Sequence, residues 1–178
     1  MTRPYRAALQ LAAALLFSLL VKPVRAAVFT FEGFPDSTIL ISQNPGLTFT
    51  NAIILTTGIS LNEFEFPPHS GSNVASDNGG PITITFSPAV QGFSGYFTYS
   101  EPLNLQVFDN SSHQVASAAS HFSHNEALSG VAGSSPNELI SVNFIGGISE
   151  VTITGDPAGS SFTLDDATIT TPKSVDPR

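Results

Sequence analysis

The residues best suited to chemistry in this sequence are two adjacent carboxylates near its end. Asp165 and Asp166 lie in the run Ser161-Phe162-Thr163-Leu164-Asp165-Asp166-Ala167-Thr168-Ile169-Thr170, which is otherwise apolar or rich in threonine. Such a composition is typical of a β-strand. Near the other end, Phe29-Thr30-Phe31-Glu32-Gly33-Phe34 predicts a second strand with an acid inside it. We expect these two terminal strands to lie side by side.

The acid pair also interrupts the alternation of its strand. With a period of two, Phe162, Leu164 and Asp166 would share one face, yet Ala167 and Ile169 look like core residues of the other face. The shift in phase predicts a β-bulge at the two acids. Bulges re-aim side chains and are frequent beside functional sites.

The charge distribution limits what can neutralise these acids. Between Ala27 and Pro172 the sequence has no Lys or Arg but thirteen Asp and Glu. An acid buried in this region must therefore be protonated, hydrogen-bonded to backbone groups or paired with a bound cation. The same distribution argues against nucleic-acid binding, which requires a basic surface.

A calcium ion would supply the missing positive charge. Calcium takes six to eight oxygen ligands from carboxylates, carbonyls and water. We expect a structural Ca2+ ion, with ligands drawn from the acids of the terminal strands and of nearby turns. These predicted metal ligands are Glu32, Asp165, Asp166, Asp36 and Asp77. The alternative is that Asp165 and Asp166 are exposed acids at a bend in the strand.

The four histidines offer a weaker metal hypothesis. His121-Phe122-Ser123-His124 has a three-residue spacing that could place two imidazoles around zinc if the segment formed a helical turn. The sequence has no HExxH pattern and no cysteine. We therefore interpret these histidines, together with His69 and His113, as polar residues of exposed loops.

No catalytic pattern stands out, and we predict that the protein is not an enzyme. A G-x-S-x-G nucleophile elbow is absent from the sequence. A glycosidase needs two carboxylates across a cleft; Glu63 with Glu65, or Glu101 with Glu126, are pairs that nothing in the sequence selects. Carbohydrate binding by aromatic stacking is also weakly supported, because Tyr96 and Tyr99 should point to opposite faces of one strand.

The first 26 residues predict a cleavable helical signal peptide. Arg3 and Arg6 precede an uncharged run over residues 7–21, and Val24-Arg25-Ala26 suits a cleavage site. A short membrane anchor is the alternative, although about 15 apolar residues fall short of the roughly 20 that span a bilayer. We predict one domain over residues 27–171 and a disordered tail over residues 172–178, with the mature protein secreted and without a membrane span.

The mature sequence predicts an all-β fold. Short runs rich in Val, Ile, Thr and Phe alternate with turn residues, and the best helical candidate is a single turn over residues 123–129. We favour an antiparallel β-sandwich of the jelly-roll type, with a closed barrel as the alternative. Strands are predicted over residues 28–33, 38–41, 47–56, 60–65, 82–87, 90–100, 103–109, 114–119, 139–145, 148–154 and 162–170.

Two resemblances follow from these segments. The export signal, Phe29-Thr-Phe-Glu-Gly-Phe and Phe162-Thr-Leu-Asp-Asp-Ala-Thr resemble exported bacterial proteins of the PEP-CTERM kind, although the C-terminal anchor of that kind is absent. Pro81-Ile-Thr-Ile-Thr-Phe-Ser-Pro-Ala-Val and Leu103-Asn-Leu-Gln-Val-Phe-Asp resemble the galactose-binding-like jelly rolls used as carbohydrate-binding modules. The second resemblance implies a structural calcium near the terminal strands, at Glu32 and at Asp165 or Asp166.

Together these observations predict a secreted, non-catalytic β-sandwich. We expect extracellular binding or matrix interaction, with polysaccharide among the candidate partners. The alternative from another class is a secreted hydrolase of the glycosidase kind, which would use loop carboxylates or histidines.

Overall fold

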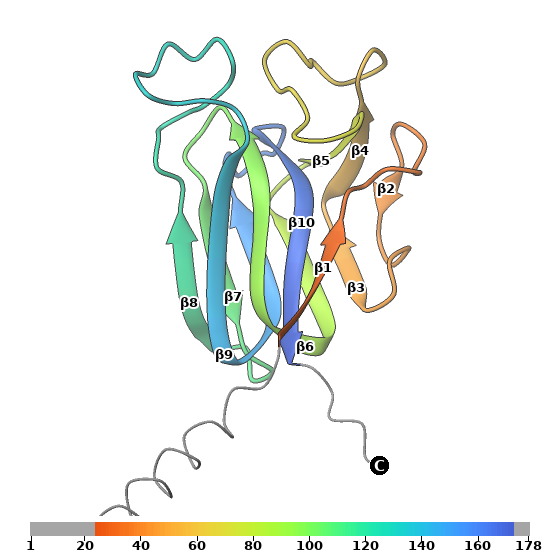
Figure 1. The fold of residues 1–178 in the computed structure, drawn as a ribbon, viewed down its shortest axis with the longest axis vertical. Coiled ribbons are helices and arrows are strands. Elements are labelled where there is room, and N and C mark those ends of the chain that lie inside the picture. The colour runs from red at the N-terminus through yellow and green to blue at the C-terminus, as the bar shows by residue number, and fades with distance from the viewer. Residues whose placement is uncertain (1–23, 173–178) are drawn as a thin grey trace, which may run out of the picture.

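The structure, a computed structural model, describes residues 24–172, which form a β-sandwich (Figure 1). No helix is present among these residues. In particular, the described part of the chain offers no helix of the length and apolarity that crossing a membrane would need. The strands are β1 (Val24–Phe29), β2 (Ile39–Leu40), β3 (Leu47–Thr50), β4 (Ala52–Thr56), β5 (Asn73–Asp77), β6 (Ile82–Tyr99), β7 (Asn104–Phe108), β8 (Gln114–Ala119), β9 (Glu138–Thr154) and β10 (Phe162–Pro172).

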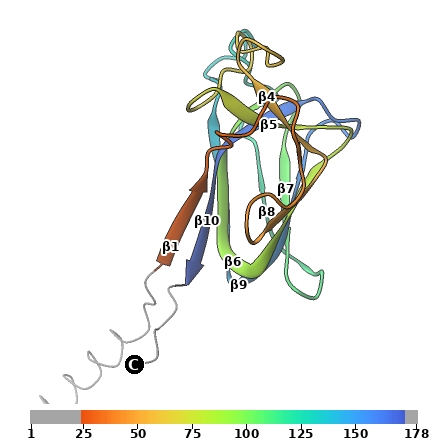
Figure 2. The same ribbon diagram turned by 90° about the vertical axis from the view of Figure 1, so that its right-hand side faces the viewer.

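Two long strands, β6 and β9, join the two layers of the sandwich. Both bend at one end of the molecule and pass from one layer to the other, as Figure 2 shows. Their first and second halves pair with different partners, and their mutual register shifts between Thr85 and Gly92. The front layer has the order β2-β4-β5-β10-β6-β9, and the back layer has the order β3-β6-β9-β7-β8.

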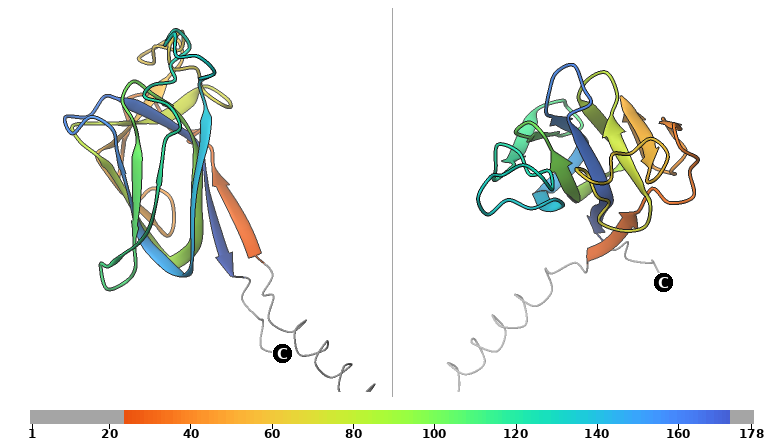
Figure 3. Two further views of the ribbon diagram at one scale, coloured as in Figure 1. Left: turned by 90° about the vertical axis from the view of Figure 1, so that its left-hand side faces the viewer. Right: turned by 90° about the horizontal axis from the view of Figure 1, so that it is seen from above.

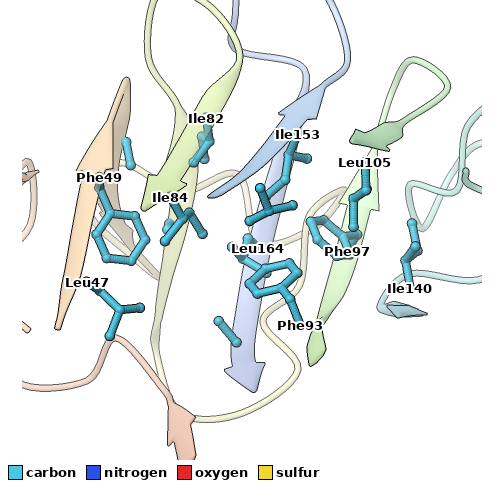
Figure 4. Packing of buried hydrophobic residues seen from close by; sticks show 14 of the residues in the cluster. Leu47, Phe49, Ile82, Ile84, Phe93, Phe97, Leu105, Ile140, Ile153 and Leu164 are labelled. Carbon is cyan, nitrogen blue, oxygen red and sulfur yellow. The ribbon is translucent and has the colours of Figure 1, made fainter. Parts of the chain in front are cut away.

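The alternation of apolar residues and threonine explains why these segments form strands with one buried face. Ile82 and Ile84 of β6 are fully buried, whereas Thr83 and Thr85, which alternate with them, lie on the outer face. The inner faces of the two layers pack together in one core (Figure 4). Phe93, Phe97 and Leu164 fill its centre from the front layer. The prediction of an all-β antiparallel sandwich is confirmed.

The terminal strands lie side by side, as predicted. β1 pairs with β10 in antiparallel register, from Val24 opposite Pro172 to Phe29 opposite Ala167. Both views in Figure 3 show the pair at the edge of the sandwich. Residues 1–23 of the predicted signal peptide and residues 173–178 of the predicted tail lie outside the described residues. The last three residues of the predicted signal, Val24 to Ala26, form the start of β1.

Several predicted elements were wrong. Residues 60–65 form turns because the carbonyl of Asn62 accepts hydrogen bonds from the N–H groups of both Glu65 and Phe66. The strand β5 was not predicted, because Asn73–Asp77 is buried at every position and shows no alternation. The predicted helical turn over residues 123–129 is irregular, since the buried side chain of Asn125 holds the chain to β6. Finally, β1 ends at Phe29, so Glu32 lies in the turn that follows it.

Candidate functional site

The predicted bulge exists at the acid pair, where β10 changes its neighbour. Before the bulge, Thr163 and Leu164 pair with β5; after it, residues from Ala167 onward pair with β1. The register against β6 shifts between Asp165 and Thr168, and Asp166 has a left-handed φ of 46°. The two carboxylates therefore face a gap in the sheet, between the end of one neighbouring strand and the start of the other.

The gap is filled by a loop that the acids hold. Oδ2 of Asp165 accepts a hydrogen bond from the backbone N–H of Ser70 at 2.9 Å. Oδ1 of Asp166 accepts one from the hydroxyl of Ser70 at 2.9 Å, while its Oδ2 lies 2.7 Å from Nδ1 of His69. The imidazole of His69 also stacks on Tyr96 of β6, with ring centroids 3.4 Å apart and planes 8° from parallel.

Glu32 holds the other side of the same loop. Its Oε1 accepts hydrogen bonds from the backbone N–H groups of Ser72 at 2.9 Å and Asn73 at 2.8 Å. Between these bonded segments lies Gly71, where a Cβ atom would collide with the Glu32 carboxylate. We call Glu32, Asp165 and Asp166 the carboxylate clasp. These three acids, which were predicted as metal ligands, hold one loop by hydrogen bonds.

Burial and hydrogen bonding shift the pKa values of the predicted ligands in opposite directions. Asp165 is 1% exposed, and this burial raises its pKa to about 6 despite hydrogen bonds from backbone N–H groups. Asp36, by contrast, has its pKa lowered, chiefly by the hydrogen bond from the hydroxyl of Ser60. In Asp77, burial raises the pKa although several donors surround the carboxylate.

The remaining two predicted ligands lie apart from the clasp. Asp36 accepts hydrogen bonds from the N–H of Thr56 at 2.9 Å and the hydroxyl of Ser60 at 2.5 Å. Asp77 accepts hydrogen bonds from the N–H and hydroxyl of Ser161 and from the N–H of Phe162. The five predicted metal ligands thus belong to three separate networks.

These networks do not fit a calcium ion. Both oxygens of Asp165 and of Asp166 are engaged, chiefly with N–H and O–H donors, which occupy the positions that a cation would take. Among the described residues, no group of three or more His, Cys, Asp or Glu side chains is placed to hold a metal. Asp165 accepts hydrogen bonds from two backbone N–H groups, whereas the partners of Asp166 are the Ser70 hydroxyl and the His69 imidazole. Calcium binding stays a prediction from the sequence.

The structure also contains a cleft that sequence reasoning missed. It has a volume of about 310 Å³, within the range of small-molecule sites. Its floor includes Ile53 and Leu55, which lie on the face of β4 opposite the fully buried core residues Ala52 and Ile54. Its lining residues come from β4, β5, β10 and their connections: Ile53, Leu55, Ser60, Leu61, Asn62, Phe66, Ser76, Asp77, Asn78, Ser160, Phe162 and Thr163.

One wall of the cleft is the connection between β4 and β5. Residues 57–66 of this connection contribute Ser60, Leu61, Asn62 and Phe66. The wall is fixed at its start by Asp36, which binds Ser60, and farther on by a hydrogen bond from the N–H of Ala127 to the carbonyl of Glu65 at 3.0 Å. The same connection continues into the loop held by the carboxylate clasp. All the protein groups that hold the wall are therefore neutral or acidic.

The chemistry of the cleft is neutral apart from one acid. Five of its lining residues are apolar, and six carry hydroxyl or amide groups. Asp77 is the single carboxylate among them, and its oxygens already accept hydrogen bonds from Ser161 and Phe162. No Lys or Arg occurs between residues 27 and 172 to attract an anion.

The cleft lies elsewhere than the sequence suggested. The two long polar segments of the sequence, residues 67–80 and 120–137, would be natural places for a binding surface, yet of these only Ser76, Asp77 and Asn78 line the cleft. The lining residues are scattered over five segments, so no local pattern could reveal them. Tyr96 and Tyr99 do point to opposite faces, with Tyr99 fully buried in the core and Tyr96 beneath His69.

The carboxylate pairs considered for hydrolysis are also outside the cleft. None of Glu63, Glu65, Glu101 and Glu126 is among its lining residues. Oε2 of Glu65 accepts a hydrogen bond from the side-chain amide of Asn62 at 2.7 Å, and Glu126 lies 3.7 Å from Nδ1 of His124.

No protein-family model and no curated protein matches this chain. Among solved structures, the chain is similar to a cleaved adhesin domain of Lys-gingipain, with 13% identity, a TM-score of 0.49, and coverage of 82% of this chain and 99% of that chain. It is also similar to a mutant of a family 29 carbohydrate binding module, with 9% identity, a TM-score of 0.48, and coverage of 88% and 100%. A family 6 carbohydrate-binding module has 13% identity, a TM-score of 0.39, and coverage of 83% and 94%. Similarity at this level assigns no ligand and no activity to the chain.

Proposed function

We propose that this protein is a non-catalytic binding domain that holds a neutral saccharide in the cleft between β4, β5 and β10. The observation that carries the proposal is the lining of the cleft, which combines apolar side chains with neutral hydroxyl and amide groups. A sugar ring has the same combination of an apolar face and hydroxyl edges. Small-ligand sites are generally built from a mostly apolar lining with a few placed polar groups.

The charge of the cleft supports a neutral ligand. An anionic saccharide, a nucleotide or a phosphate would meet Asp77 and no positive side chain from residues 27–172. A neutral saccharide can instead exchange hydrogen bonds with Asn62, Asn78 and Ser160 while its apolar face packs on Phe66. Polysaccharide outside the cell is the partner that we propose, in keeping with the export signal expected in residues 1–26.

The hydrolase alternative receives less support from the same cleft. A glycosidase places two carboxylates on either side of the scissile bond. Asp77 is the one carboxylate among the described lining residues, and Ser161 and Phe162 already donate to both of its oxygens. Binding without chemistry is the function that this arrangement favours.

The test compares two phenylalanines of one loop. The purified protein is screened against an array of neutral and acidic glycans, and hits are measured by isothermal titration calorimetry. We expect Phe66→Ala to weaken binding of a neutral glycan at least tenfold, because Phe66 lines the cleft. Phe64→Ala should leave binding unchanged, because Phe64 is 79% exposed and outside the cleft.

Melting temperatures separate loss of the ligand contact from loss of the fold. If Phe66→Ala proves unstable, Asn62→Ala tests the same wall through a side chain that is exposed to solvent. Absence of binding to every neutral glycan by the folded protein would overturn the proposal. So would equal affinity of the Phe66→Ala and Phe64→Ala variants.

A further inference from the structure

One asparagine that lines the cleft precedes a glycine. Asn78-Gly79 is the one Asn-Gly step in the sequence, and it directly follows β5. Asparagine followed by glycine is the sequence most prone to spontaneous loss of its side-chain amide, because glycine has no Cβ to hinder attack by its own nitrogen. We propose that Asn78 is a site of spontaneous deamidation, which places a second carboxylate in the cleft.

The reaction needs only water. The backbone nitrogen of Gly79 attacks Cγ of Asn78, and a new N–Cγ bond closes a five-membered succinimide ring. The Cγ–Nδ2 bond breaks, and ammonia leaves with the proton that the Gly79 nitrogen gives up. Water then adds to one of the two ring carbonyls. Opening at one carbonyl gives aspartate, and opening at the other gives isoaspartate, in which the backbone is longer by one methylene group.

The surroundings of Asn78 leave both reacting groups free. Asn78 is exposed, and within residues 24–172 its side-chain amide makes no hydrogen bond. The nitrogen of Gly79 likewise donates to no backbone acceptor within that range. Gly79 is itself exposed. A Cβ atom on Gly159 would lie 2.6 Å from the Gly79 nitrogen, so Gly159 packs beside this nitrogen without placing a side chain over it.

Other asparagines in the same structure serve as internal comparisons. Asn125 is fully buried, and its side chain binds the backbone of Tyr99, Phe97 and Ser135. Asn73 is also buried and donates to the carbonyls of Phe31 and Phe34. These bonds hold the amide carbon away from the next nitrogen. Asn110 is exposed, but the serine that follows it hinders attack more than a glycine does.

The product would alter the lining of the cleft at a position that a backbone hydrogen bond holds. The N–H of Asn78 donates to the carbonyl of Asn51 at 2.8 Å, so an added methylene would shift this part of the lining. A new carboxylate there would lie next to Asp77, which is already buried, with no Lys or Arg in residues 27–172 to offset it. Ageing would thus convert a nearly neutral cleft into an acidic one.

The modification is tested by mass spectrometry on the folded protein. The full chain is kept in mildly alkaline buffer for days, digested, and each Asn peptide is assayed for aspartate and isoaspartate. We expect conversion at Asn78 first, slower conversion at Asn110, and none at Asn73 or Asn125. The Asn78→Gln variant should show no conversion at position 78. Conversion at Asn110 with Asn78 intact, or conversion of Asn78 only in denaturant, would overturn the proposal.

The consequence for binding rests on the proposed function of the cleft and has a separate readout. Fresh protein, aged protein and aged Asn78→Gln protein are titrated with a neutral glycan that the fresh protein binds. We expect aged wild-type protein to bind several-fold more weakly and the aged variant to keep the affinity of its own fresh sample. Equal affinity of fresh and fully converted wild-type protein would overturn the effect on the cleft. If fresh protein binds no glycan, the proposed function fails, while the mass measurement still decides the modification.

Discussion

The backbone N–H of Ser70 donates a hydrogen bond to Oδ2 of Asp165 over 2.9 Å, although the two residues are 95 positions apart in sequence. This bond joins the loop before β5 to the bulge in β10. It replaces the hydrogen bond that a neighbouring strand would otherwise supply at this position. Its acceptor is a buried carboxylate that has no Lys or Arg partner. Its energetics depend on protonation in a way that can be measured.

The pH dependence of unfolding should report on Asp165. Its pKa in the folded protein is about 6, above the ordinary value of 3.8, so the folded state binds a proton more tightly than the unfolded chain. The stabilisation from this proton is full below about pH 3.8 and is lost as the pH rises through 6. Between pH 5 and pH 7 the change is about 1 kcal/mol, or about 2–4 °C in Tm for a chain of this size.

Calorimetry on the wild-type protein and on Asp165→Asn checks this prediction. We expect the wild-type Tm to be higher at pH 5 than at pH 7, and the variant to lose that difference. Asp36 does not contribute in this window, because its pKa is lowered and its stabilisation disappears only at more acidic pH. A wild-type Tm that falls between pH 7 and pH 5 would contradict the assigned sign.

The contact between Glu32 and the loop should make Gly71 intolerant of a side chain. Both Gly71 and Gly58 have positive φ, 59° and 73°, so alanine is strained at either position. Only at Gly71 would the new Cβ also collide with the Glu32 carboxylate. We therefore expect Gly71→Ala to cost about 1–3 kcal/mol more than Gly58→Ala, because it also breaks the hydrogen bonds to Ser72 and Asn73.

Urea denaturation of the two variants gives the comparison, and a third variant identifies the cause. In a Glu32→Ala background, the extra cost of Gly71→Ala should shrink, because the group it collides with is gone. Equal destabilisation by Gly71→Ala and Gly58→Ala would show that the Glu32 contact carries little energy.

Removal of divalent cations should leave the fold unchanged. The predicted calcium ligands are divided among three networks, and the acids of the bulge already accept hydrogen bonds. We expect the same Tm in EDTA and in excess calcium, within the error of the measurement. A rise in Tm with calcium that Asp166→Asn abolishes would instead establish the metal site that the sequence predicted.

Asn125 should be among the most sensitive polar positions. Its side-chain oxygen accepts from the N–H of Tyr99 at 2.7 Å, and its nitrogen donates to the carbonyls of Phe97 and Ser135. Asn125→Ala leaves these buried backbone groups without partners, which costs about 1–3 kcal/mol for each group that water cannot reach. Asn110→Ala, at an exposed turn, is the matched control and should change the free energy of unfolding by less than about 0.5 kcal/mol. Similar effects of the two substitutions in urea denaturation would contradict this role for Asn125.

The sequence predicted the parts of the fold that depend on local alternation. The threonine-rich strands and the bulge at Asp165 and Asp166 follow from the period of apolar residues. The pairing of the terminal strands was predicted instead from the similar acid-containing segments at the two ends. β5 escaped prediction because its polar residues are buried by long-range partners: Asp77 by Ser161, and Asn73 by Thr56 and Phe34. The acids were recognised as a group in need of a partner, but backbone N–H groups leave no signature in the sequence. The cleft depends on tertiary structure alone.

The pairing of Val24 with Pro172 places both ends of the described chain at one pole of the sandwich (Figure 1). The connection between β4 and β5, which forms a wall of the cleft, emerges at the opposite pole. A tether, a fused domain or a sensor surface joined at either end would therefore lie at the end of the molecule opposite this wall of the cleft. Attachment through the N-terminal end and attachment through the C-terminal end are therefore equivalent for immobilisation or display. Because the two ends lie next to each other, the domain could also be inserted as a single unit into a loop of a host protein.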